Sequence, residues 1–292
     1  MQFPGKAIAH LLESEIKKAV AQLHRKKHSV KLSVILVGQS PEQMSYVKMK
    51  QITANKLGIG YKIIQVKTTP PFEQFARLIK KTAANPEVNG IVIQQPLPAQ
   101  IRTESVYDFV PLSKEIEGHR HKTIYIPPIG QAVLTTLKWI YYPQKAKLSI
   151  LFDSNKDQGF FKKIFHHKKI ILIGRGITGG QPIGKTLSAY KINYLSLNST
   201  ADHPEEYIKD ADIIISAVGK NVVLANQIKP GVILINVGLR YENNKLVGDY
   251  NEKEIKNICS FYTTTPGGVG PIDVLCLYKN LIEATKNQYS IK

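Results

Sequence analysis

The sequence of 292 residues contains few cysteines and no long apolar run. Its two cysteines, Cys259 and Cys276, are too few for a disulfide scaffold and lack the spacing of metal ligands, so we expect buried thiols in a reducing compartment. The longest apolar runs have the length of strands, and the N-terminus lacks the basic start and apolar core of a signal peptide. These absences predict a cytoplasmic protein without a metal site or a membrane-spanning segment.

Acidic residues are also scarce, since 22 of them stand against 40 basic residues and give a formal net charge of +18. Such an excess is typical of proteins that bind nucleic acids or membrane surfaces. The lysines are dispersed, however, and no nucleic-acid-binding motif accompanies their local clusters. We therefore expect a solvated basic surface, no nucleic-acid partner and no membrane partner, with a potential that attracts polyanionic small molecules.

Short apolar runs alternate with amphipathic segments in the first half of the chain. The predicted elements are strands at 32–38, 61–66 and 90–93 and helices at 11–23, 41–57 and 72–84. Strands that alternate with helices favour a parallel sheet, which predicts an N-terminal α/β domain over residues 1–130. A further helix over 274–286 is expected to pack back onto this domain, so that residues 274–292 belong to it.

Tyr46, Lys50 and Gln94 are candidate active-site residues. Tyr46 and Lys50 are four residues apart on a predicted helix, so their side chains share one face. Taken alone, they are better explained as two solvated side chains, because lysines on helices are usually at the surface. Gln94 changes this balance, since the prolines after it end a buried strand, and ligands bind beyond the carboxyl ends of parallel strands.

The second half predicts a Rossmann-like domain over residues 131–273. The expected strands are 169–173, 193–197, 212–218 and 231–237, preceded by a connecting helix at 131–139. Between this helix and the first strand, residues 141–169 have no clear period and predict an irregular insertion. The fold class is therefore two α/β domains, an N-terminal parallel-sheet domain and a Rossmann-like NADP-binding domain, with the active site in the cleft between them.

The glycine-rich segment Gly174 to Gly180 follows a predicted strand and precedes a predicted helix. This is the context in which glycines allow a pyrophosphate to approach backbone N–H groups, although a tight turn alone would explain the pattern. The next strand ends in Asn198-Ser199-Thr200, without the acidic residue that binds an adenosine ribose. Because Arg175 and Ser199 could hold a 2′-phosphate there, we predict NADP rather than NAD as the cofactor.

Several motifs occur in the order that is typical of one enzyme family. They are Tyr46-x-x-x-Lys50, Ile93-Gln94-Gln95-Pro96-Leu97-Pro98, Lys114-Glu115-Ile116-Glu117-Gly118, Gly174-Arg175-Gly176 with Gly180-x-Pro182, and Pro266-Gly267-Gly268-Val269-Gly270-Pro271. In this order the chain resembles, over nearly its whole length, the FolD-type methylenetetrahydrofolate dehydrogenase/cyclohydrolases. The resemblance implies a cytoplasmic homodimer of one-carbon metabolism that serves purine biosynthesis, oxidises methylenetetrahydrofolate with NADP and hydrolyses the methenyl product to 10-formyltetrahydrofolate.

The resemblance also implies roles for individual residues. Lys50 would exchange a proton with water during hydrolysis, Gln94 would hold Lys50, and Tyr46 would lie against the folate as a third catalytic residue. Substrate-binding positions are Tyr46, Glu117, Gly267, Gly268 and Pro271, with Glu117 accepting hydrogen bonds from the pterin amino groups. Cofactor-binding positions are Gly174, Arg175, Gly176, Gly180, Pro182, Ser199, Val218, Gly219 and Gly238.

Four departures from the family pattern surround the expected folate site. The family has Asp-Val-Asp-Gly where this chain has Glu115-Ile116-Glu117-Gly118, a serine in place of Gln43, a longer loop than 118–128, and a threonine in place of Asp273. These departures motivate a second interpretation, a nucleotide- or folate-binding protein with little catalysis. A third interpretation, a dehydrogenase of amino or hydroxy acids, has no dedicated substrate motif to support it.

Overall fold

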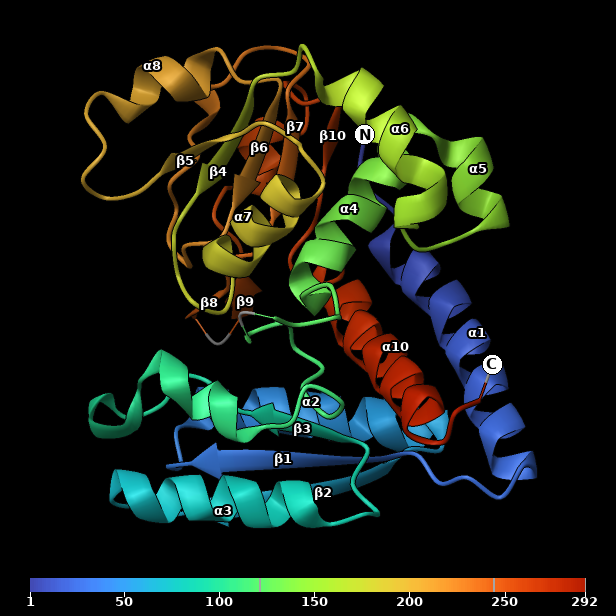
Figure 1. Cartoon of the computed structure of the whole chain (residues 1–292). Helices are drawn as coiled ribbons and strands as arrows, with labels where there is room; N and C mark the ends of the chain where they lie inside the picture. The colour runs from blue at the N-terminus through green and yellow to red at the C-terminus, as the bar shows by residue number, and fades with distance from the viewer. Residues whose placement is uncertain (121, 244, 292) are drawn as a thin grey trace. The chain divides into compact units, whose positions relative to one another are not determined.

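The structure is a computed structural model in which the chain forms two compact units (Figure 1). Each unit is named by its parallel sheet: the three-stranded unit comprises residues 13–128 and 274–292, and the five-stranded unit comprises residues 1–12 and 129–273. The described residues are 1–120, 122–243 and 245–291, with only the backbone described at 41, 42, 104 and 148.

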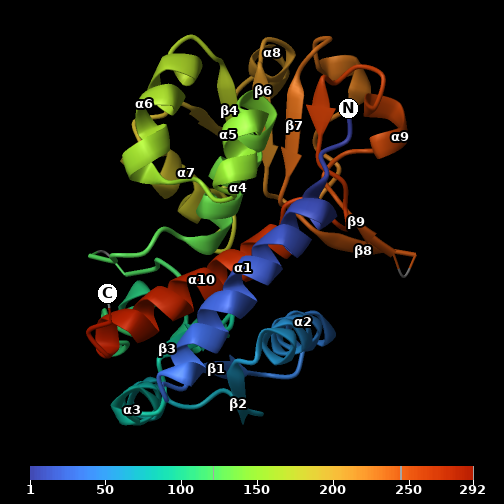
Figure 2. The ribbon, with the colours of Figure 1, turned by 90° about the vertical axis from the view of Figure 1, so that its right-hand side faces the viewer.

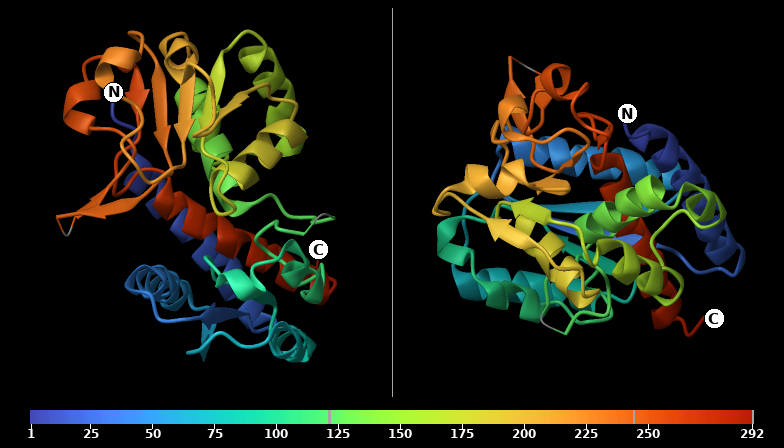
Figure 3. Two further views of the ribbon diagram at one scale, coloured as in Figure 1. Left: turned by 90° about the vertical axis from the view of Figure 1, so that its left-hand side faces the viewer. Right: turned by 90° about the horizontal axis from the view of Figure 1, so that it is seen from above.

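The three-stranded unit is a parallel sheet in the order β2-β1-β3. Its elements are β1 (Lys31–Val37), α2 (Pro41–Leu57), β2 (Gly60–Val66), α3 (Phe72–Ala84), β3 (Gly90–Ile93), and the 3-10 helices η1 (Ala99–Ile101) and η2 (Glu104–Phe109). Figures 2 and 3 show α2 and α3 on opposite sides of this sheet. The predicted bounds of these three strands and of α2 and α3 are confirmed to within one residue, because buried apolar runs alternate with segments that have clear start and stop residues. The helix predicted at 11–23 is longer in the structure and spans α1 (Gly5–Arg25).

Helix α2 begins and ends where its sequence predicts. The Ser40 side chain accepts a hydrogen bond from the Gln43 backbone N–H, and Gly58 closes the helix in the left-handed conformation at φ 75°. Glycine adopts this φ without the steric cost that a Cβ would bring. These two ends fix the helix register and so decide where Tyr46 and Lys50 lie along it.

The C-terminal helix α10 (Gly270–Gln288) contributes its residues from 274 onward to the three-stranded unit. The Tyr278 hydroxyl donates to the Lys50 carbonyl oxygen at 2.6 Å. The Asn280 amide donates to the carbonyl oxygens of Ile116 and Ile126, both at 2.9 Å. Helix α10 thus ties the Lys50 helix and the segment around Ile116 to one rigid element.

The five-stranded unit is a parallel sheet in the order β10-β7-β6-β4-β5. Its strands are β4 (Ile170–Ile173), β5 (Leu195–Leu197), β6 (Ile213–Ser216), β7 (Ile233–Asn236) and β10 (Phe261–Tyr262). Its other elements are α4 (Pro128–Tyr141), α5 (Pro143–Leu148), α6 (Ser154–Phe165), α7 (Gly180–Ala189), α8 (Pro204–Lys209), η3 (Ala225–Gln227), α9 (Glu252–Ile255) and an antiparallel hairpin of β8 (Arg240–Glu242) and β9 (Lys245–Val247). Alternate strand residues, among them Ile171, Ile214 and Leu234, form a core with Ile208 of α8 and Ile255 of α9.

The first residues of the chain lie beside β10 (Figure 2). The Phe3 N–H donates to the Tyr262 carbonyl oxygen at 2.8 Å, and the Tyr262 N–H donates to the Met1 carbonyl oxygen at 3.0 Å. These bonds are why residues 1–12 belong to the five-stranded unit, whereas the predicted domain bounds placed them with residues 13–130. Helix α1 (Gly5–Arg25) therefore begins in one unit and ends in the other.

The prediction of an irregular segment at 141–169 is wrong, because two helices, α5 and α6, occupy most of it. Asp153 caps α6 by accepting from the Asn155 N–H at 3.0 Å, and Phe161 and Phe165, four residues apart, are buried on one face. Lysines on the exposed face hide this period from a reading of the sequence. The buried face of α6 is identified only by the residues that pack against it in the folded chain.

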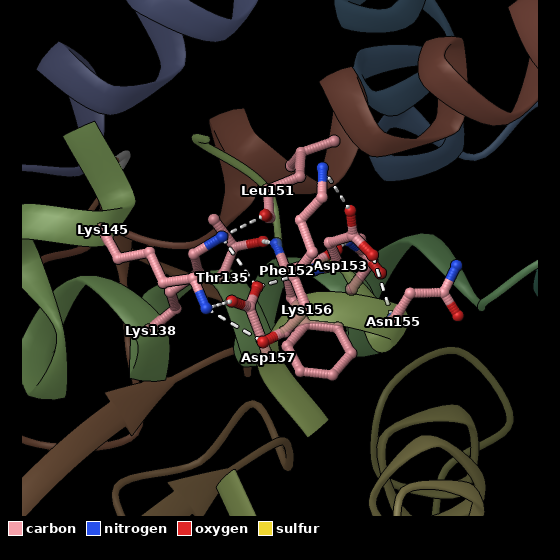
Figure 4. Close-up of polar contacts among 10 residues, drawn as sticks. Thr135, Lys138, Lys145, Leu151, Phe152, Asp153, Asn155, Lys156 and Asp157 are labelled. Atoms are coloured by element: carbon pink, nitrogen blue, oxygen red, sulfur yellow. Dashed lines mark hydrogen bonds and ion pairs between the residues drawn. The ribbon is translucent and has the colours of Figure 1, made fainter. Parts of the chain in front are cut away.

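A buried ion pair joins α4 to α6 in this region (Figure 4). The Lys138 ammonium lies 2.7 Å from a carboxylate oxygen of Asp157, with side-chain exposures of 0% and 1%. The ammonium also donates to the Leu151 carbonyl oxygen at 2.7 Å, and Lys145 of α5 approaches the other oxygen of Asp157 at 3.3 Å. A charge buried this deeply needs such partners, because an unpaired one would lose its hydration without compensation.

Both cysteines are buried free thiols, as their number and spacing predict. Among the described residues, no helix combines the length and apolarity that a membrane crossing requires. The described residues also contain no group of three or more His, Cys, Asp or Glu side chains that could hold a metal ion.

Candidate active site

Lys50, Gln94 and Glu117 meet at the carboxyl end of the three-stranded sheet. Lys50 comes from α2, Gln94 directly follows β3, and its N–H donates to the Ile35 carbonyl oxygen of β1 at 2.9 Å. The Lys50 ammonium donates to the Gln94 side-chain oxygen at 3.0 Å and lies 4.0 Å from a carboxylate oxygen of Glu117. Lys50 and Glu117 each keep 17% of their side chain exposed, so the pair is largely desolvated yet still reachable.

The proton affinity of Glu117 is unusual for a carboxylate. Burial raises its pKa to about 7, the positive charge of Lys50 opposes this rise, and the negative charge of Glu115 adds to it. A hydrogen bond with the Ile93 backbone favours the ionised form. Glu117 therefore changes its charge near neutral pH, where an ordinary glutamate is already ionised.

Glu115 holds the turn that carries Glu117, a role that the sequence did not reveal. It is 2% exposed, and one of its carboxylate oxygens accepts from the N–H groups of Glu117 at 3.0 Å and His119 at 3.2 Å. Its other oxygen is buried without a hydrogen-bond partner among the described residues. Glu115 thus fixes the backbone of the turn, whereas Glu117 faces Lys50.

Side-chain hydrogen bonds of Gln94 and Gln95 fix the position of Gln94. The Gln94 amide donates to the Gln95 carbonyl oxygen at 2.8 Å, and the Gln95 amide donates to the Tyr107 hydroxyl at 2.7 Å. Tyr107 in turn stacks on His119, with ring centroids 4.4 Å apart. Because Gln94 and Gln95 are both buried, their rotamers are fixed by these bonds, and the Lys50 ammonium meets a preorganised acceptor.

Tyr46 and Gln43 lie on the same helix as Lys50. Tyr46 is 37% exposed one helical turn before Lys50, which leaves its ring available to a ligand. Gln43 is buried and its amide donates to the Pro96 carbonyl oxygen at 2.7 Å. The residue that replaces the family's serine thus links the start of α2 to the segment after β3.

The glycine-rich turn of the five-stranded unit fits a dinucleotide phosphate. Gly174 has φ 106°, which a residue with a Cβ rarely adopts, and a Cβ at Gly180 would collide with the Gly174 carbonyl group. Gly176, by contrast, faces open space, and the turn leads into the N-terminus of α7, where Pro182 is buried. Backbone N–H groups and the positive end of the helix dipole suit an anion at this place.

Arg175 on this turn reaches β5, where sequence reasoning missed its partner. The guanidinium donates through Nε to the Ser196 hydroxyl at 3.1 Å and through Nη2 to the Ser196 carbonyl oxygen at 3.2 Å. Ser199, the predicted partner in phosphate binding, lies exposed on the turn that follows β5. The structure thus brings Arg175 to the end of β5, with Ser196 as its anchor.

Val218, Gly219 and Gly238 gather around Asp249, which sequence reasoning also missed. The Asp249 carboxylate accepts from the N–H groups of Val218 at 2.9 Å and Gly219 at 2.8 Å, and a Cβ at Gly238 would collide with it. Burial raises the pKa of Asp249, while these backbone bonds favour its ionised form. One buried carboxylate therefore lies against the turns after both β6 and β7, and its hydrogen-bond partners Val218 and Gly219 are 31 and 30 residues away in the sequence.

Gly267, Gly268 and Pro271 belong to the five-stranded unit, whereas Lys50 belongs to the three-stranded one. Gly267 has φ 103°, and a Cβ at Gly5 would collide with the carbonyl oxygens of Gly267 and Gly268. The glycine loop therefore packs directly on the start of α1. Pro271 follows in the first turn of α10.

These features define an α/β enzyme with a dinucleotide-binding unit and a second unit that carries a lysine-centred site. Residues 3–117 match the model of the tetrahydrofolate dehydrogenase/cyclohydrolase catalytic domain, and residues 161–289 match the NAD(P)-binding domain of the same family. The bifunctional protein FolD of Brevibacillus brevis is 30% identical over 286 residues, which cover 97% of this chain and 96% of that protein. The chain belongs to the tetrahydrofolate dehydrogenase/cyclohydrolase family.

Solved structures show the same fold. The bifunctional FolD enzyme of Campylobacter jejuni is similar with a TM-score of 0.84 at 25% sequence identity, covering 98% of this chain and 99% of that one. The Trypanosoma brucei FolD, complexed with NADP cofactor and inhibitor, has a TM-score of 0.81 at 22% identity, with coverages of 99% and 98%. The predicted family and the predicted class of two α/β domains are thereby confirmed.

Proposed function

We propose that this protein oxidises 5,10-methylenetetrahydrofolate with NADP and hydrolyses the resulting 5,10-methenyltetrahydrofolate to 10-formyltetrahydrofolate. Family membership defines the two activities. The observation that carries the proposal to this chain is the Lys50 ammonium, bonded to Gln94 at 3.0 Å and facing Glu117 at 4.0 Å. The four departures from the family pattern leave this cluster assembled.

Lys50 is the residue that moves a proton during hydrolysis. Its side chain is largely desolvated and fixed by Gln94. Once the ammonium has released a proton to solvent, the amine can accept the proton of a water molecule that attacks the methenyl carbon. The same amine returns a proton when the ring nitrogen of the folate becomes the leaving group. Gln94 keeps the amine in one position through both transfers, which preserves the alignment on which the rate depends.

Glu117 and Tyr46 bind and orient the folate. The ionised carboxylate of Glu117 accepts hydrogen bonds from the donor groups of the pterin, a charge-assisted pairing. The exposed ring of Tyr46 offers a flat surface to the folate beside Lys50. Since Glu117 has a pKa of about 7, its binding role is complete only above neutral pH.

The dinucleotide is held by the five-stranded unit. NADP supplies the hydride acceptor for the oxidation. The turn from Gly174 to Gly180 presents backbone donors to its pyrophosphate, and Arg175 with Ser199 receives its 2′-phosphate. No acidic side chain directly follows β5, where Asn198, Ser199 and Thr200 stand instead, so these three positions place no negative charge beside the additional phosphate.

We further propose a homodimer of one-carbon metabolism that works in the cytoplasm and serves purine biosynthesis. Gly267, Gly268 and Pro271 are proposed substrate-side positions, and Val218, Gly219 and Gly238 are proposed cofactor positions. The weakly catalytic binding protein is the other candidate, and the lengthened side chains of Glu115 and Glu117 are the observation that favours it.

One assay tests the proposal. Purified protein is mixed with methylenetetrahydrofolate and NADP, and the absorbances of NADPH and of the methenyl product are followed separately. We expect NADPH to accumulate while the methenyl absorbance stays low, because hydrolysis consumes that product. Binding of NADP without formation of NADPH would contradict the proposal and support the weakly catalytic alternative.

A further inference from the structure

Arg175 is anchored at an unusual place, the open edge of the five-stranded sheet. Within the described residues, strand β5 pairs only with β4, and it ends the strand order. The Gly174 N–H donates to the Leu197 carbonyl oxygen at 2.9 Å, so the carbonyl of Leu197 faces β4. Successive carbonyls of a strand point in opposite directions, and the carbonyl of Ser196 therefore faces away from β4.

The Arg175 guanidinium occupies this edge position with two parallel contacts. Its Nη2 donates to the Ser196 carbonyl oxygen at 3.2 Å and its Nε donates to the Ser196 hydroxyl at 3.1 Å. One contact alone would let the planar guanidinium rotate about a single bond, whereas two fix its plane. They use two of the five N–H groups, and a guanidinium has enough donors left to hold a phosphate with two further bonds.

We infer that Ser196 is a positioning residue that holds the Arg175 guanidinium for the 2′-phosphate of NADP and thereby sets the preference of this protein for NADP over NAD. The inference rests on the proposed function in one respect only, the use of NADP. The Ser196 hydroxyl itself touches no phosphate; it acts through the plane in which Arg175 is held. The backbone contact remains in any variant, so Ser196 contributes part of the fixation.

Equilibrium binding of two nucleotides tests this role without any turnover. Adenosine 2′,5′-bisphosphate carries the 2′-phosphate, and adenosine 5′-monophosphate lacks it. We expect Ser196→Ala to weaken the bisphosphate by about threefold to tenfold, as the loss of one hydrogen bond to a charged group at a partly exposed site implies, and to leave the monophosphate unchanged. Ser196→Thr keeps a hydroxyl on a strand-favouring residue and should restore the bisphosphate affinity.

Two further variants sharpen the test. Ser196→Asp should ion-pair with Arg175 and repel the 2′-phosphate, which lowers the bisphosphate affinity by on the order of a hundredfold while the monophosphate still binds. Thr200→Ala is the matched control, because its hydroxyl bonds Asn198 on the neighbouring turn at 3.0 Å and should leave both affinities unchanged when it is removed.

The outcomes separate this inference from the proposed function. Equal weakening of both nucleotides by Ser196→Ala, or no weakening of either, would overturn the role of Ser196. Failure of the wild-type protein to reduce NADP with methylenetetrahydrofolate, while the bisphosphate binds with the expected pattern, would reject the proposed function and support the role of Ser196. If Ser196→Ala does not fold, a nucleotide preference that survives intact in Ser196→Asp would equally overturn the inference.

Discussion

Two lysine–carboxylate pairs in this molecule show how differently the same two groups are used. Lys138 and Asp157, in the five-stranded unit, are 2.7 Å apart and almost fully buried (Figure 4). Lys50 and Glu117, in the three-stranded unit, are 4.0 Å apart, and each remains 17% exposed. The first pair is closed by further contacts to Leu151 and Lys145, whereas the second leaves space between its charges.

The two pairs differ in how far each charge is compensated by its surroundings. A closed, buried pair compensates its own desolvation and holds helices together, so neither partner can leave without a large loss of stability. In the open pair, burial raises the pKa of Glu117 to about 7, and the charge of Lys50 opposes this rise only in part. The open pair can exchange protons and accept a ligand, and we expect its disruption to affect chemistry more than folding.

The largest expected effect comes from breaking the closed pair. Asp157→Asn keeps the shape of the side chain but leaves the Lys138 charge buried beside a neutral partner, which should lower the free energy of unfolding by about 3–5 kcal/mol. Urea unfolding, followed by circular dichroism, measures this loss. The double variant Lys138→Met with Asp157→Asn removes the uncompensated charge and should recover most of it. Full stability in the single variant would contradict the distinction between the two pairs.

The second prediction removes the support of the open pair. Gln94→Ala frees the Lys50 ammonium from its acceptor, and we expect hydrolysis of methenyltetrahydrofolate to fall on the order of tenfold to a hundredfold, because the amine loses its fixed position. The measurement is the decay of methenyl absorbance, with NADP affinity as a control that should not move. Ordinary hydrolysis rates in this variant would show that Gln94 has no positioning role.

The smallest effect concerns pH. In the proposed function the ionised carboxylate of Glu117 binds the pterin, so kcat/KM for methylenetetrahydrofolate should be highest above about pH 7 and fall as the pH decreases through the pKa of Glu117. Glu115→Gln removes the nearby negative charge that raises this pKa, and the decline should begin at lower pH. Steady-state rates between acidic and alkaline pH measure both curves. A decline at the same pH in the two proteins would exclude the influence of Glu115.

The comparison also shows what the sequence could reveal. The elements around the open pair were predictable, because α2, α3 and β3 carry local start and stop residues and regular periods. Lys50 and Gln94 were predictable as a pair, since a helix face and the end of a parallel strand meet at one edge of the sheet. The departure from aspartate to glutamate at Glu117 was visible, but its approach to Lys50 required coordinates.

The remaining features depend on distant partners. Asp157 lies 19 residues beyond Lys138, and no local pattern indicates that the two are joined, which is why α5 and α6 were not expected. The Asp249 carboxylate accepts a hydrogen bond from the backbone N–H of Val218. Because every residue type except proline has such an N–H group, the side chains in this segment do not indicate the contact. The sequence indicates Ser199 rather than Ser196 as the partner of Arg175, because the direction of the Arg175 side chain depends on the open edge of β5.

Proton transfer by Lys50 is the central step of the proposed hydrolysis. The decisive measurement is the hydrolysis rate of methenyltetrahydrofolate in Lys50→Met, beside Lys48→Met, which removes an exposed lysine from the same helix. We predict a loss of about 10²–10⁴-fold for Lys50→Met with NADP affinity and unfolding free energy preserved, and an unchanged rate for Lys48→Met. Hydrolysis by Lys50→Met at the wild-type rate would contradict the account.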